Sequence, residues 1–177
     1  MAEQALSKDK VVELASGVSG PYLGRLFGSY GAEVIKVEVP PGGDEARLYG
    51  PFPGDIPDPE RSGMFLFLNT SKRGITLDLK SDTGRALFLR LLPDYDLLVE
   101  NFRPGVMARL GLDYEALSGA NARLVVTSIT NFGQTGPYRD YRAVDIISQA
   151  MGGPLFLSGE ADREPARFVG HQAQFHG

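Results

Sequence analysis

Short apolar runs alternate with segments of helical periodicity along most of the chain. Residues 11–14 and 33–37 are brief and largely apolar, as expected of buried strands. Between them, the turn at residues 17–21 opens a segment whose apolar residues recur at helical spacing, namely Tyr22, Leu23, Leu26 and Phe27. A strand, a helix and a second strand predict parallel pairing through a crossover helix. We therefore expect an α/β fold with a Rossmann-like parallel sheet flanked by helices.

The same alternation continues toward the C-terminus. It predicts strands over residues 75–79, 96–100 and 124–130, and helices over residues 81–92, 106–110, 114–118 and 143–151. The segment 50–62 is rich in Pro, Gly and Asp, and loops of this length tend to be functional or mobile. We expect one domain over residues 11–177, preceded by a polar tail over residues 1–10.

Composition and charge narrow the class of protein. Residues 1–10 lack the apolar core of a signal peptide, and no run approaches the ~20 apolar residues of a membrane span. The net charge of -4 argues against bulk binding of nucleic acid or anionic membranes. We therefore expect a cytoplasmic, soluble protein without membrane or nucleic-acid partners. With no cysteine, any acyl transfer must use another nucleophile or a thiol supplied by the substrate.

Positive charge is concentrated beside loops rich in glycine and proline. The cations form three groups, Lys72 with Arg73, Arg103 with Arg109, and Arg139 with Arg142. Each group is either solvated surface charge or a local site for a polyanionic ligand. Loops 101–105 and 131–138 each follow a predicted strand, and open α/β sheets place ligand crevices at such strand ends.

Three of these loops together resemble class III coenzyme A (CoA) transferases, the CaiB/BaiF family. They are Glu-Asn-Phe-Arg-Pro-Gly-Val-Met at 100–107, Asn-Thr-Ser-Lys-Arg-Gly at 69–74 and Asn-Phe-Gly-Gln-Thr-Gly-Pro at 131–137. The likeness continues through residues 20–21, 31–38 and 111–112 in one order. It implies the N-terminal part of the family's large domain, without the smaller domain and the C-terminal return. Full-length relatives form interlocked homodimers or fused two-copy chains, so the resemblance implies such a partner.

The resemblance implies acyl-CoA and a carboxylic acid as substrates. The positions that match the CoA site are Gly17, Val18, Ser19, Asn69, Lys72, Arg73, Asn101, Phe102, Arg109, Gly136 and Arg142. Read without the family, Gly17-x-x-Gly20 could approach a dinucleotide phosphate, but the third glycine of the dinucleotide motif is absent, and we expect no nicotinamide. His171 and His176 lack acidic neighbours, and we expect no metal.

The family nucleophile is an aspartate, and the aligned position here is Gln174. A carboxamide is a poor nucleophile and cannot form the usual aspartyl thioester, so we do not expect the standard reaction. Asp145 matches a carboxylate near the acyl site, although capping a helix explains it equally well. Two hypotheses stay open. The chain is part of a transferase that moves CoA between an acyl-CoA and an acid, or a catalytically silent acyl-CoA-binding half or partner subunit.

Overall fold

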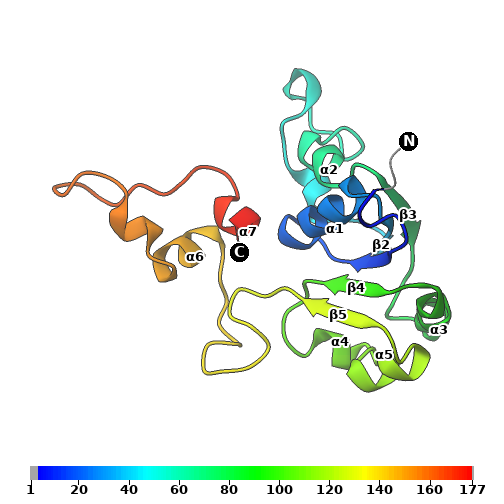
Figure 1. Cartoon of the computed structure of the whole chain (residues 1–177). Helices are drawn as coiled ribbons and strands as arrows, with labels where there is room; N and C mark the ends of the chain where they lie inside the picture. The colour runs from blue at the N-terminus through cyan, green and yellow to red at the C-terminus, as the bar shows by residue number, and fades with distance from the viewer. Residues whose placement is uncertain (1–3, 177) are drawn as a thin grey trace.

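A five-stranded parallel sheet forms the centre of the chain, which a computed structural model describes over residues 4–176 (Figure 1). The strands lie in the order β3-β2-β1-β4-β5, and every pair is parallel. Their bounds are β1 Lys10–Leu14, β2 Glu33–Glu38, β3 Lys72–Thr76, β4 Leu97–Glu100 and β5 Val125–Ser128. Strands β2 and β3 lie on one side of β1, and β4 and β5 lie on the other. This arrangement confirms the Rossmann-like α/β prediction.

Helices cover both faces of the sheet because side chains of each strand alternate between the faces. Val11 and Val34 pack under helix α1 (Ser19–Ser29), together with Leu23 and Phe27. Val12 faces the opposite layer, which contains the core residues of α3 (Asp82–Leu91) and α5 (Tyr114–Ala120). Short 3₁₀ turns lie in the connections between these elements, namely η1 Glu45–Leu48, η2 Pro53–Asp55 and η3 Leu92–Asp94.

Local sequence signals set several helix starts. Ser81 caps α3 by accepting a hydrogen bond from the amide of Gly84, and Asp113 caps α5 through the amide of Ala116. Ser62 caps α2 (Gly63–Leu68) in the same way. Such side-chain oxygens satisfy amides that the first helical turn leaves unpaired. The four-residue helix α4 (Val106–Arg109) follows the loop after β4.

The C-terminal segment extends away from the sheet and returns to α1 (Figure 1). It contains α6 (Asp145–Met151), the 3₁₀ turn η4 (Pro154–Leu157) and α7 (Gln172–His176). The ring of Phe175 meets Tyr22 edge-on at 5.1 Å and Phe67 at 6.5 Å between centroids. These contacts attach α7 to the helices at the N-terminal half of the chain.

Two predicted boundaries differ from the structure, and one helix was not predicted. The third strand lies at Lys72–Thr76, not residues 75–79, so Lys72 and Arg73 lie inside β3 and not in the loop before it. Lys10 belongs to β1, so the polar tail ends earlier than residue 10; residues 1–3 lie outside the described part. Helix α2 was not predicted, because its six residues carry too little periodicity to separate a helix from a strand.

Candidate functional site

The loops after β1 and β4 meet where the order of the strands reverses. The side chain of Asn101 binds both main-chain groups of Ser16: its Oδ1 accepts from the Ser16 amide at 3.0 Å, and its Nδ2 donates to the Ser16 carbonyl at 2.7 Å. The carboxamide of Asn101 thus joins the loop after β4 to the loop after β1. This is the place where open α/β sheets hold their ligands.

The side chain of Asp44 also holds the turn at Ser16 and Gly17. Its Oδ1 accepts from the amides of Gly17 and Ala46, both at 2.8 Å, and from the hydroxyl of Ser16 at 3.2 Å. Its Oδ2 lies 2.6 Å from the ammonium of Lys36. Gly17 has a φ of 79°, which favours glycine and lets the turn bring its amide to this carboxylate.

Asp44 belongs to a buried group of four charges that we call the buried tetrad: Glu13, Lys36, Asp44 and Lys72. Lys36 pairs with Glu13 at 2.8 Å, and Lys72 pairs with the other oxygen of Glu13 at 2.6 Å. The lysine side chains are only 3% and 2% exposed, and both carboxylates are fully buried. The members come from three adjacent strands and the turn after β2, under α1, and their charges balance.

Burial and attraction compete at each lysine. Burial disfavours the charge of Lys36, but Glu13 and Asp44 together outweigh it and raise the pKa of Lys36 above its ordinary value. Burial dominates at Lys72 and lowers its pKa to about 8, although Glu13 acts in the opposite direction. Gly24 makes room for this arrangement, because a Cβ there would overlap the Glu13 carboxylate.

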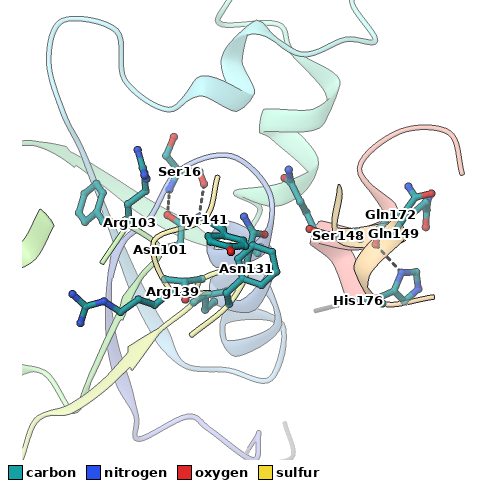
Figure 2. Close-up of a pocket in the computed structure, with 18 of the residues that line it drawn as sticks. Ser16, Asn101, Arg103, Asn131, Arg139, Tyr141, Ser148, Gln149, Gln172 and His176 are labelled. Carbon is teal, nitrogen blue, oxygen red and sulfur yellow. Dashed lines mark hydrogen bonds between the residues drawn. The ribbon is translucent and has the colours of Figure 1, made fainter. Parts of the chain in front are cut away.

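A cavity of about 960 Å³ opens beside the Ser16 turn (Figure 2). Ser16, Asn101 and Arg103 lie on one side of it, and Gln149, Gln172 and His176 lie on the other. Its other lining groups include Ser19, Phe102, Asn131, Phe132, Arg139, Tyr141, Ser148 and Gln174. Among the lining residues within 4–176, Glu45 is the one acidic side chain, and Arg103 and Arg139 are basic, so the cavity favours an anionic ligand. A smaller cavity of about 310 Å³ shares Ser16 and Phe102 with the large one.

Two residues of α6 hold the C-terminal wall. Asp145 Oδ1 accepts from the amide of Ala173 at 2.9 Å, and its Oδ2 accepts from the Gln149 side chain. Gln149 Oε1 in turn accepts from the amide of Phe168 at 2.9 Å. His171 stacks on Tyr49 with 4.8 Å between ring centroids. These contacts place Gln174 at the cavity.

The structure brings together some of the site residues predicted from the sequence. Ser19, Asn101, Phe102 and Gln174 line the large cavity, while Gly17 and Val18 form the turn behind it. Asp145 lies behind the C-terminal wall, with both oxygens occupied.

Other predicted residues lie outside the cavity. Lys72 is buried in the tetrad, and Asn69 accepts a hydrogen bond from it at 2.9 Å. Arg73 is an exposed residue of β3 that pairs with Glu33. The remaining three, Arg109, Gly136 and Arg142, are exposed and do not line the cavity.

Sequence reasoning missed several residues that shape the site. Asp44 follows a proline- and glycine-rich turn that carries no periodic signal, and Gln149 lies on a helix that shows no obvious chemistry. Ser16 precedes the glycine turn and gave no signal of its own. Arg103 and Arg139 were noted as cations, and the structure adds that both line the cavity.

Two other kinds of site were searched for within residues 4–176. No group of three or more His, Cys, Asp or Glu side chains in this range is placed to hold a metal ion. No helix in the same range is long and apolar enough to cross a membrane.

The chain is similar to known proteins over nearly its whole length. The acetyl-CoA:oxalate CoA-transferase of Acetobacter aceti is 44% identical over 160 residues, which are 90% of this chain and 40% of that protein. The succinate–glutarate CoA-transferase of Agrobacterium fabrum is 43% identical over 164 residues, 92% of this chain and 41% of that protein. The chain thus spans about two fifths of these relatives.

A solved structure agrees with the sequence relatives. A CaiB/BaiF family protein from Brucella suis superposes with a TM-score of 0.88 at 40% identity, covering 98% of this chain and 46% of that one. The model of CoA-transferase family III matches residues 6–175. The chain therefore belongs to CoA-transferase family III.

Proposed function

We propose that this chain is the CoA-binding part of a protein that moves CoA between an acyl-CoA and a carboxylic acid. The observation that carries the proposal is the cavity at the ends of β1 and β4, which has two arginines in its lining and the position of the family nucleophile on its far wall. Its volume of about 960 Å³ lies at the upper end of the ~300–1,000 Å³ common for ligand sites. Arg103 and Arg139 suit the phosphates of CoA.

The acid substrate is a dicarboxylate in this proposal. The relatives named above are described by their action with oxalate, succinate and glutarate, each of which carries two carboxylates. One carboxylate would form the thioester, and the other would keep a charge in the cavity. The excess of positive charge in the lining supports such a substrate.

Gln174 determines what the unaltered chain does. In the aspartyl mechanism, a carboxylate oxygen attacks the thioester carbon and CoA leaves as the thiolate. The thiolate then attacks the aspartyl carbonyl and releases the acyl group as a carboxylate. The neutral carboxamide of Gln174 has no oxygen nucleophile of comparable strength. The chain therefore binds acyl-CoA without transferring CoA, unless another group supplies the nucleophile.

Two assays test the proposal. Equilibrium dialysis with labelled acetyl-CoA should detect binding, and mass spectrometry should detect no exchange of CoA between succinyl-CoA and glutarate. Gln174→Asp should then introduce exchange. Absence of binding by the unaltered chain would refute the proposal. Exchange by the unaltered chain would refute the role given to Gln174.

A matched pair of variants tests where binding occurs. Arg103→Gln should weaken binding by about tenfold, because it removes one charge-assisted contact. Arg90→Gln removes the same charge from the exposed side of α3 and should leave binding unchanged. Equal effects of the two variants would show that general charge, and not this cavity, governs binding.

The silent-partner hypothesis follows from the same substitution. A chain that binds acyl-CoA without a nucleophile could complete a site whose nucleophile belongs to another chain. The two chains would then form an interlocked homodimer or the two halves of a fused protein. Light scattering after size-exclusion chromatography tests self-association. A monomer with full affinity for acyl-CoA would argue against a partner-dependent site.

A further inference from the structure

Gln149 is a buried carboxamide that binds main-chain groups of a distant segment. It lies on α6 and is only 3% exposed. Its Oε1 accepts from the amide of Phe168 at 2.9 Å, and its Nε2 lies 3.4 Å from the carbonyl of the same residue. A buried carboxamide with its donor and acceptor both used has one stable orientation.

Asp145 extends this contact to the residue before Gln174. The Gln149 side chain donates to Asp145 Oδ2, and Asp145 Oδ1 accepts from the amide of Ala173. The connection thus runs from Phe168 through two side chains of α6 to Ala173. It fixes both ends of the segment that carries His171.

The opposite wall of the cavity is held by the same kind of contact, a side-chain carboxamide bound to the main chain of a loop. Asn101 binds the amide and the carbonyl of Ser16, just as Gln149 binds those of Phe168. In both places a carboxamide joins an element to a loop that has no strand partner. The two walls of the cavity are therefore held by separate polar contacts.

We propose that Gln149 is a positioning residue that, through Asp145, orients the side chain of residue 174 at the acyl-CoA cavity. This inference rests on the proposed function and assigns Gln149 a part in it. Asp145 then supports the reacting position through the hydrogen bonds that its two oxygens accept.

A single cysteine tests the orientation of residue 174, since the chain has none of its own. In Gln174→Cys, the thiolate can attack the thioester carbon of acetyl-CoA. The bond from that carbon to Sγ forms, the bond to the CoA sulfur breaks, and CoA leaves as a thiolate that takes up a proton. The transferred acetyl group is measured by mass spectrometry of the protein.

The variant under test is Gln149→Met in the Gln174→Cys background. Acetylation by acetyl-CoA should slow by about tenfold or more, the loss expected when two or three hydrogen bonds orient the group. Alkylation by iodoacetamide, which needs an accessible thiolate but no orientation toward a bound thioester, should not slow. Gln4→Met, the same change at an exposed position away from the cavity, serves as the control. Equal acetylation rates with and without Gln149 would overturn the proposal.

Amide hydrogen exchange separates this proposal from the proposed function. Gln149→Met should lower protection at Phe168 and Ala173 by about tenfold, with no change in β1. If the unaltered chain does not bind acetyl-CoA but this loss is seen, the proposed function fails and the positioning contact stands. If protection at both amides is unchanged, the positioning role is overturned.

Gln149→Glu keeps the size of the side chain and makes the protection of Ala173 depend on pH, which a change of side-chain volume alone would not do. At neutral pH the introduced carboxylate faces Asp145 without a donor, and protection at Ala173 should fall. Acidification should restore it, because a neutral carboxylic acid can donate to Asp145 Oδ2. Protection that does not depend on pH in this variant would contradict the proposed contact.

Discussion

Replacing Asp44 with alanine tests the claim that the buried tetrad holds the Ser16 turn. The change leaves the Lys36 ammonium buried with Glu13 as its one remaining ion-pair partner within residues 4–176. It also leaves the amides of Gly17 and Ala46 without the oxygen that accepts from both. Asp44→Ala should therefore destabilise the fold and loosen the turn together.

The magnitude follows from the burial of these groups. Removing one partner of a buried ion pair costs about 3–5 kcal/mol, because the other charge stays out of water. Losing the amide contacts overlaps with this cost, so we expect a total near 4 kcal/mol. For a chain of this length each kcal/mol lowers Tm by about 2–4 °C, which gives a fall of about 8–16 °C.

Urea unfolding followed by far-UV circular dichroism measures the change. Asp113→Ala is the control, since Asp113 accepts a hydrogen bond at the start of α5 but is exposed, and its loss should cost about 1 kcal/mol. An Asp44→Ala chain as stable as the control would refute the reasoning. It would mean that water or main-chain movement replaces the lost carboxylate.

The remaining predictions concern packing and pH. Gly24→Ala should destabilise by about 2–3 kcal/mol in the same assay, because its methyl group would overlap Glu13, whereas Gly119→Ala in α5 meets no atom within 4 Å and should stabilise by about 0.4–1 kcal/mol. A Gly24→Ala chain at least as stable as the unaltered chain would disprove the clash. Bonds from Arg47 lower the pKa of Glu38 below 4.5, so the stability from this pair is present above pH 4.5 and is lost as the pH falls below it. Urea titrations at neutral and acid pH should show a weaker pH dependence in Glu38→Gln, and an unchanged dependence would contradict the assignment.

The sheet and its helices were predictable because their signals are local and periodic. The continuous burial of residues 11–14 in β1 follows from a short, largely apolar run, and the apolar face of α1 follows from the helical repeat. The strand at residues 72–76 was misplaced because its pattern contains Lys72, Arg73 and Gly74, which look like a loop. An ion pair with Glu13 compensates the buried charge of Lys72, and the sequence does not show that pair.

Part of the candidate site could be found from the sequence, for a related reason. Asn101 and Phe102 belong to a loop with distinctive residues directly after a strand, and they line the cavity. Asp44 and Gln149 act through partners 27 and 19 residues away. No spacing rule links such positions, so only the folded chain shows that they shape the cavity walls.

The two walls of the cavity differ in how firmly they are attached, and this difference bears on how a ligand would act. Ser16 is tied to the sheet by Asn101 and to the core by Asp44. The wall that carries Gln174 follows a run over residues 160–170 in which every residue is exposed, and it depends on a few contacts from α6 and the ring of Phe175. Segments with so little buried surface open at a small fraction of the global free energy. A ligand that touches both walls therefore adds stability mainly to the second. Under the proposed function, binding of acyl-CoA would therefore be coupled to the stability of the wall that carries residue 174.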